Sequence, residues 1–154
     1  YDMFSIDFEC ENGVHFHSMC RQINGCSNAV GEEVFGTKGS WNSFDHEIKD
    51  LQGNVIWKYD KEAEEAAFKQ HNPYVLEHVD AFNQIRRGTS IDEATACAVS
   101  CLAGVMGRES AYTGKSVTWE EMSKSDLDYM PAKLEIGPMD MSQYTVRVPG
   151  NDKK

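Results

Sequence analysis

The sequence predicts an α+β fold, in which helices pack on one face of a largely antiparallel open sheet of about five or six strands. Three observations support this prediction. Short apolar and polar alternations separated by glycine-containing turns fill residues 4 to 59, and helical periodicity follows from residue 72 to 113. The later helix is also lined with small residues, which allow another backbone to approach closely. We therefore expect that helix to lie against the sheet.

The first two strands are predicted as a hairpin over residues 4 to 20, because apolar and polar residues alternate on both sides of a short polar loop. A two-residue turn at Asn12-Gly13 would mix the two faces. A three-residue loop with a left-handed Gly13 sets Phe8 opposite Phe16 and keeps one face apolar. We choose this second register, in which Cys10 and Cys20 are too far apart for a disulfide.

Two further hairpins and a charged linker are expected next. In the first hairpin, the turn is Thr37-Lys38-Gly39, and Phe35 faces Trp41. In the second, the turn is Gln52-Gly53-Asn54. The expected strands are residues 30–36, 40–44, 47–51 and 55–59, and residues 61–70 are expected to be an exposed linker with some helix.

Two consecutive helices are predicted over residues 72 to 115. Asn72 is a good cap and Pro73 suits the first helical position, while Gly88 ends the first helix. Its apolar face is predicted to hold Val75, His78, Val79, Phe82 and Ile85, with His78 as a hydrogen-bonded core residue rather than a metal ligand.

The second helix is predicted to start at a capping box formed by Ser90 and Glu93 and to end near Thr113, with Gly114 as its terminator. A short third helix opens at a second capping box, Thr118 with Glu121. We expect residues 132–154 to form an extended tail, with residues 151–154 disordered. No second domain is expected within the chain. The small residues of the second helix are Ala94, Ala96, Cys97, Ala98, Ser100, Ala103, Gly104, Gly107, Ser110 and Ala111.

Composition restricts the possible partners. The chain has 154 residues and a formal net charge of −10, which argues against a nucleic-acid partner. No apolar run is long enough to span a membrane. The five cysteines lack metal-ligand spacing, so we expect neither a zinc site nor a structural disulfide. The chain begins at Tyr1 within a strand, and we expect it to be a fragment whose compartment, periplasmic or cytoplasmic, is open.

The face of the first hairpin that the helices leave uncovered carries an acidic and histidine-rich set of side chains. The chosen register pairs Asp7 with His17 and Glu9 with His15. Such a set could hold a divalent metal. We favour a cross-strand charge ladder on a pH-sensitive oligomer contact, because histidine gains charge near neutral pH. The predicted interface residues are Asp7, Glu9, His15, His17 and Met19, next to Arg21.

The loop from Arg21 to Asn28 is the candidate substrate wall. It concentrates an arginine, amides and a thiol, and the hairpin topology places it at the end of the sheet nearest to the segment expected before Tyr1. Arg21 and Asn28 are the predicted substrate-binding residues. The alternative is a polar loop that only closes a strand connection.

Several stretches resemble the C-terminal sheet domain of the Gfo/Idh/MocA oxidoreductases. The resemblance covers residues 1 to 131 and rests on the order and spacing of its stretches. The subgroup that the chain resembles is typically bacterial, is often exported and handles sugars or cyclitols. The stretches are Tyr1–Phe4 with Asn12–Val14, Met19–Asn28, Gly36–Ser40, Asn72–His78, Met106–Lys115 and Val117–Trp119.

The resemblance implies a domain of the dihydrodipicolinate reductase-like type, with substrate-side and oligomerisation roles over residues 1–131. The parent enzyme would be an NAD- or NADP-dependent oxidoreductase acting on a sugar or cyclitol. Its Rossmann domain and its catalytic residues would lie before Tyr1, so no catalytic, cofactor or metal residue is carried over to this chain. The chain alone would be inactive and would form a homo-oligomer through the open sheet face. Two alternatives remain: an NAD-dependent glycoside hydrolase of the same family, and a non-catalytic binding or assembly module.

Overall fold

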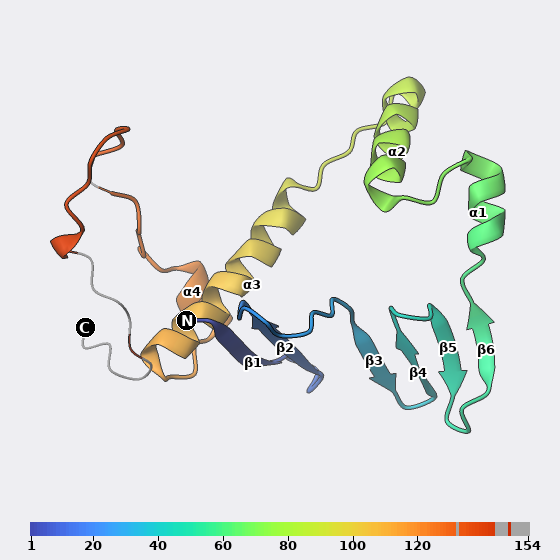
Figure 1. Cartoon of the computed structure of the whole chain (residues 1–154), viewed down its shortest axis with the longest axis horizontal. Coiled ribbons are helices and arrows are strands. Elements are labelled where there is room, and N and C mark those ends of the chain that lie inside the picture. The colour runs from blue at the N-terminus through green and yellow to red at the C-terminus, as the bar shows by residue number, and fades with distance from the viewer. Residues whose placement is uncertain (132, 144–147, 149–154) are drawn as a thin grey trace. The chain divides into compact units, whose positions relative to one another are not determined.

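The fold is α+β, as the sequence predicts, and is shown as a computed structural model in Figure 1. The structure describes residues 1–131, 133–143 and 148. The chain divides into two compact units, Tyr1–Gly25 with Glu93–Lys154 and Cys26–Asp92, and each is described by itself. The elements are β1 Met3–Glu9, β2 His15–Arg21, β3 Glu33–Gly36, β4 Gly39–Asn42, β5 Glu47–Asp50, β6 Val55–Lys58, α1 Lys61–Phe68, α2 Pro73–Arg87, α3 Ala94–Thr113, α4 Trp119–Ser123 and the short 3₁₀ helix η1 Met141–Gln143.

The first unit is built on the β1–β2 hairpin, whose predicted register is confirmed. Phe8 lies opposite Phe16, and the Cys10 N–H donates to the Val14 carbonyl. Gly13 has a φ of +76°, the left-handed conformation that the three-residue loop requires. The alternation of apolar and polar residues is therefore sufficient to predict the register of this hairpin.

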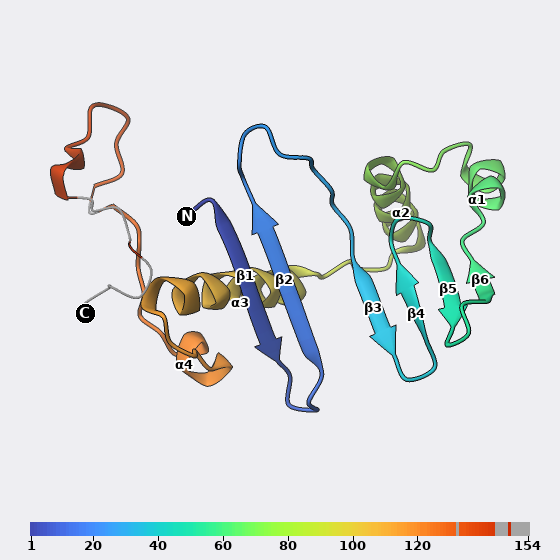
Figure 2. The same cartoon turned by 60° about the horizontal axis from the view of Figure 1, so that its bottom comes forward.

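Helix α3 packs on the apolar face of this hairpin, as Figure 2 shows. The contact is made at Gly107, which is buried. A Cβ atom placed there would lie 3.0 Å from Phe8 Cζ and 3.3 Å from Ile6 Cγ2. A Cβ at Gly104 would meet nothing within 4 Å. Of the two helical glycines, only Gly107 is needed for close approach to the strands.

Helix α4 packs against α3. Its predicted capping box is confirmed, because the Thr118 hydroxyl accepts from the Glu121 N–H while the Glu121 carboxylate accepts from the Thr118 N–H. Met122 in α4 is the one buried large apolar side chain among the residues that the structure describes. The core of the first unit therefore lies where α3 meets β1 and α4.

The second unit contains a four-stranded antiparallel sheet in the order β3-β4-β5-β6. The prediction that Phe35 faces Trp41 is wrong: Phe35 lies opposite Ser40, and Trp41 lies opposite Val34. Gly36 and Gly39 pair directly, so the turn has two residues rather than three. A side chain at Gly39 would place its Cβ against the Lys49 carbonyl, and this close approach requires glycine.

Helices α1 and α2 follow this sheet. Helix α1 lies within the expected linker of residues 61–70, and the ends of α2 match the prediction. The Asn72 side chain accepts from the Tyr74 N–H, and Gly88 has a φ of +69°. The expected apolar face of α2 is not buried, since Phe82 and Ile85 are exposed. His78 is exposed as well, with its Nε2 3.8 Å from a Glu77 carboxylate oxygen, so its assignment to the core was wrong.

The predicted single sheet is wrong. The hydrogen bonds make two sheets, a two-stranded one in the first unit and a four-stranded one in the second. Residues 22–32 between β2 and β3 join no ladder, so the pairing of strands does not pass from one hairpin to the next. Among the described residues, α3 with β1 is the only packed helix–strand pair, so the prediction of several helices on one sheet face holds for α3 alone.

Two local predictions about the later chain also change. Helix α3 begins at Ala94, and Ser90 forms no capping box, because Glu93 takes the cap position without a side-chain hydrogen bond. The predicted tail contains η1, while residues 132, 144–147 and 149–154, including the stretch expected to be disordered, lie outside the described residues. Within the described part of the chain, no helix combines the length and apolar character needed to cross a membrane.

The contrast between the two glycines of α3 is testable. We expect Gly107→Leu to destabilise the first unit by about 1–3 kcal/mol, because the added side chain must displace Ile6 and Phe8. Gly104→Ala should stabilise it by about 1 kcal/mol through helix propensity. Native-state hydrogen exchange of the β1–β2 amides measures both effects. As a matched control, Gly104→Leu should destabilise the unit less than Gly107→Leu, because no atom lies within 4 Å of the Gly104 position. Equal destabilisation by the two leucine variants would contradict this packing.

Candidate functional surface

The candidate surface is the outer face of the β1–β2 hairpin, the face opposite α3. Residues at alternate positions of both strands point to this side, and all of them are exposed. The pairs on it follow the predicted register, with Asp7 opposite His17 and Glu9 opposite His15. The outer face consists of Met3, Ser5, Asp7, Glu9, His15, His17, Met19 and Arg21.

The side-chain hydrogen bonds on the outer face run diagonally rather than directly across. His15 Nδ1 donates to Asp7 Oδ2 over 2.8 Å, and the Ser5 hydroxyl and His17 Nε2 share a hydrogen bond of 2.9 Å. Diagonal neighbours come within reach of such side chains because the strands twist. The predicted pairs are confirmed as cross-strand neighbours, while the side-chain hydrogen bonds join each histidine to its diagonal neighbour instead.

The hydrogen bond from Asp7, followed by the attraction of its charge, raises the pKa of His15 above its ordinary value of 6.5. The charged His15 is thereby favoured near neutral pH, which gives the outer face a salt bridge whose strength depends on pH. Among the residues that the structure describes, no group of three or more metal-binding side chains lies close enough to hold an ion. The arrangement thus suits an electrostatic contact surface better than a metal site.

The Ser5–His17 pair has two of the groups used in nucleophilic catalysis, a hydroxyl and an imidazole. Both are exposed on an open sheet face, and Asp7, the carboxylate opposite His17, hydrogen-bonds to His15 instead. A catalytic histidine needs a third group that orients it. The pair therefore lacks the arrangement of a catalytic triad.

The predicted substrate residues occupy the two ends of the loop from Arg21 to Asn28. Arg21 is the last residue of β2 in the first unit, whereas Asn28 belongs to the second unit, and both are exposed. A turn with Gly25 at a φ of +77° lies between them, and Cys26 is a free thiol. Arg21 and Asn28 belong to different units. Their joint role in substrate binding therefore stays a prediction.

The sequence analysis missed an aromatic and charged cluster at the C-terminal half of α3. The Arg108 guanidinium lies 4.8 Å from the Tyr129 ring centre, and its Nη2 is 3.2 Å from Glu109 Oε1. The Tyr129 hydroxyl donates to the same Glu109 oxygen over 2.9 Å. The spacing of Arg108 and Tyr112, one helical turn apart, was the available signal. This cluster ties the chain after α4 back to α3, which is a structural role.

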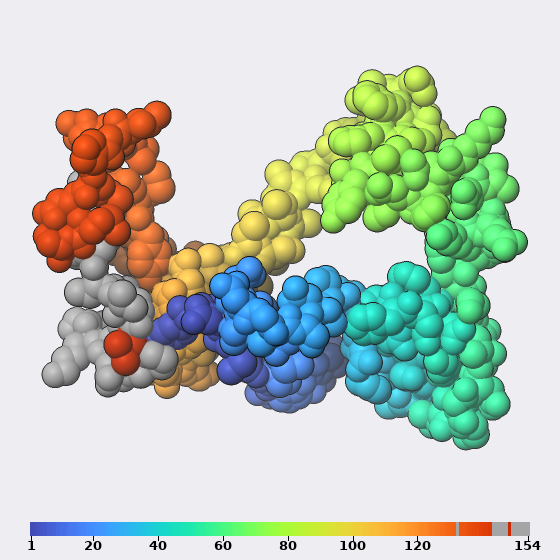
Figure 3. Space-filling view, viewed as in Figure 1, coloured from blue at the N-terminus to red at the C-terminus, as the bar shows by residue number. Residues whose placement is uncertain are grey.

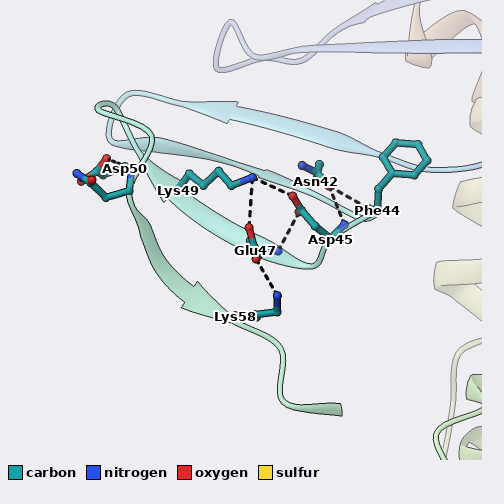
Figure 4. Close-up of polar contacts among 8 residues, drawn as sticks. Asn42, Phe44, Asp45, Glu47, Lys49, Asp50 and Lys58 are labelled. Carbon is teal, nitrogen blue, oxygen red and sulfur yellow. Dashed lines mark hydrogen bonds and ion pairs between the residues drawn. The ribbon is translucent and has the colours of Figure 1, made fainter. Parts of the chain in front are cut away.

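A second charged cluster lies on the four-stranded sheet of the second unit (Figure 4). Lys49 bridges Asp45 at 2.8 Å and Glu47 at 3.3 Å, and Lys58 binds Glu47 at 2.8 Å. The hydrogen bonds from Lys58 and then Lys49 lower the pKa of Glu47, and the one from Lys49 lowers the pKa of Asp45. Charges that satisfy one another in this way join β5 and β6, and no catalytic role follows from them.

Comparisons with protein-family models, with curated proteins and with solved structures find no match to this chain.

The pKa of His15 provides a direct test of the diagonal pair. We expect Asp7→Asn to lower it towards 6.5, because both the hydrogen bond and the charge of Asp7 are removed. NMR titration of the ring protons measures the change. Glu9→Gln is the matched control and should lower the pKa less, since Glu9 contributes only a small attraction. A larger effect of Glu9→Gln would contradict the pairing.

The same pair fixes the direction of a pH effect on the hairpin. Because the pKa of His15 is higher in the folded hairpin, the pair stabilises the hairpin fully below pH 6.5, and the stabilisation is lost as pH rises through the folded pKa.

Proposed function

We propose that this chain is the C-terminal, substrate-side and oligomerisation domain of an NAD- or NADP-dependent oxidoreductase of the Gfo/Idh/MocA type, acting on a sugar or cyclitol. The proposal rests on the order and spacing of the matching stretches. The observation that supports it most is that stretches distant in sequence meet in the first unit. Residues 1–4 and 12–14 of the resembling stretches belong to the hairpin region, and residues 106–113 of another stretch form the C-terminal part of α3, which packs on the hairpin at Gly107.

In this proposal the nicotinamide cofactor binds a separate nucleotide-binding domain, and hydride transfer takes place there. The present chain provides polar groups for the substrate. Arg21 donates hydrogen bonds from a fixed fork of N–H groups, which suits the hydroxyl oxygens of a sugar. Asn28 offers both a donor and an acceptor. The homo-oligomer contact is proposed for the outer face.

A non-catalytic assembly module is the second candidate, and the exposure of the outer face favours it. Met3 and Met19 are 64% and 73% exposed on that face, beside the Asp7–His15 pair, and a partner would cover them together. The related hydrolytic reading, in which the same cofactor supports glycoside cleavage by transient oxidation, differs from the leading proposal only in its net reaction.

The first experiment concerns the cofactor. We expect isothermal titration calorimetry of this chain with NAD and NADP to give no binding heat, because the proposal places the cofactor site on another domain. A lactate-type dehydrogenase of known affinity serves as the positive control. Tight binding to this chain would contradict the placement of the cofactor.

The second experiment tests the activity itself. The open reading frame that contains this chain should yield a protein that reduces NAD or NADP in the presence of a sugar or cyclitol, followed by nicotinamide absorbance. Arg21→Ala should raise the substrate KM about tenfold, the loss expected for one hydrogen bond from a charged group, and leave the cofactor KM unchanged. Arg86→Ala, at the exposed end of α2, is the matched control. No turnover with any sugar or cyclitol would favour the assembly module.

A further inference from the structure

The turn at Asn24-Gly25, in the connection after β2, is a feature that neither the fold nor the proposed function explains. The chain contains two Asn-Gly dipeptides, Asn12-Gly13 in the β1–β2 loop and Asn24-Gly25. An asparagine followed by glycine can react with its own backbone, because glycine has no side chain to obstruct the amide nitrogen. The two dipeptides therefore carry the same reacting groups in two different turns.

Steric access is the same at the two dipeptides. All four residues are exposed, and each glycine is left-handed, with a φ of +76° at Gly13 and +77° at Gly25. A Cβ atom placed on either glycine would meet nothing within 4 Å. Crowding therefore does not distinguish Asn12 from Asn24.

Hydrogen bonds do distinguish them. Asn12 Oδ1 accepts from the Val14 N–H over 3.1 Å, and the Gly13 N–H donates to the Cys10 carbonyl over 2.8 Å. The side chain of Asn12 and the nitrogen that follows it are thus both held in place, as in an Asx turn.

Asn24 is not held in this way. Within the described part of the chain, neither the Asn24 side chain nor the Gly25 N–H makes a hydrogen bond. The side-chain amide of Asn24 is therefore able to rotate onto the Gly25 nitrogen without losing a contact.

We propose that Asn24 is a site of spontaneous deamidation, through a cyclic imide formed with Gly25, and that the hairpin loop protects Asn12 from the same reaction. This inference uses only the two turns and does not depend on the proposed enzymatic function.

The reaction needs only water. The Gly25 amide nitrogen gives its proton to water or hydroxide and attacks Asn24 Cγ. The new bond closes a five-membered ring, and the Cγ–Nδ2 bond breaks with release of ammonia. Because both reacting groups belong to adjacent residues, their proximity favours this attack over attack by solvent.

Water then opens the imide at one of its two carbonyl groups. Addition at the side-chain carbonyl gives aspartate, whereas addition at the backbone carbonyl gives isoaspartate, in which the chain runs through the former side chain. The net reaction replaces NH2 by OH and transfers no electrons.

At Asn12 the same ring can form only after two hydrogen bonds are broken. The Gly13 nitrogen must leave the Cys10 carbonyl, and the Asn12 side chain must leave the Val14 N–H. Together these losses lower the population of the reactive conformation at least about tenfold.

Deamidation at Asn24 changes the connection in two ways. It adds a carboxylate to the loop that begins at Arg21, and isoaspartate adds one carbon to the backbone. Gly25 is the last residue of its stretch in the first unit and Cys26 opens the second, so the added carbon lies in the covalent connection between the units. Figure 2 shows this connection as a segment without helix or strand.

The test incubates the folded full chain at neutral pH and body temperature. Trypsin cleaves after Arg21 and Lys38, so Asn12 and Asn24 fall in separate peptides, residues 1–21 and 22–38. Fragment masses distinguish Asn24 from Asn28, and a sample taken at the start corrects for reaction during digestion. We expect Asn24 to deamidate at least about tenfold faster than Asn12. Equal rates, or a faster reaction at Asn12, would overturn the proposal.

Denaturation separates the effect of structure from that of sequence. In guanidinium chloride both turns are lost, and the two asparagines keep only their shared Asn-Gly sequence. We expect the two rates to come within about threefold of each other. A tenfold difference that survives denaturation would assign it to neighbouring residues and overturn protection by the hairpin loop.

A pair of variants assigns the product to one residue. Asn24→Gln keeps an amide but would need a larger ring, so isoaspartate in the peptide of residues 22–38 should disappear. Asn28→Gln, in the same peptide, is the matched control and should leave it unchanged. Isoaspartate is counted with an isoaspartyl methyltransferase and a labelled methyl donor. Its persistence in Asn24→Gln, or its loss in Asn28→Gln, would overturn the assignment to Asn24.

Discussion

The close contact between α3 and the β1–β2 hairpin at Gly107 is the interaction on which the first unit depends. An isolated two-stranded hairpin is marginal in water and needs a helix or a further strand against its apolar face. Gly107 allows α3 to come within contact distance of Ile6 and Phe8. Without a small residue at this position the helix would stand off from the strands, and the apolar face of the hairpin would be open to water.

This contact makes the two faces of the hairpin unequal. The face towards α3 holds Phe4, Ile6 and Phe8, each half-buried, while the opposite face carries the Asp7–His15 pair and two exposed methionines. The same helix reaches the edge of β1, where Ser110 and Ala111 line a shallow groove together with residues from Met3 to Asp7. One packing contact therefore determines which face of the hairpin is covered by α3 and which is exposed.

In the second unit, pairing between successive strands is enough to form an amphipathic sheet. Val34, Trp41, Ile48 and Trp57 lie opposite one another across successive strands, while Glu47 and Lys58 pair in the same sheet. The register slips between Ile48 and Lys49, where β6 contributes an extra residue. The N-terminal half of α3, residues 94–101, is exposed, and its yellow atoms are uncovered on the face that Figure 3 shows. Both units thus present apolar surface that their own elements do not cover.

The sequence by itself determined the features that depend on neighbours three or four residues apart or on a single turn. These include the register of the first hairpin through Gly13, the ends of α2 at Asn72 and Gly88, and the capping box of α4. Each rests on local sterics or on one side-chain-to-backbone hydrogen bond, which any short stretch reveals. Tertiary structure decided the division into two sheets, the diagonal partner of His15 and the exposure of His78. These depend on strand pairing, twist and packing between segments far apart in the chain, and no short pattern encodes them.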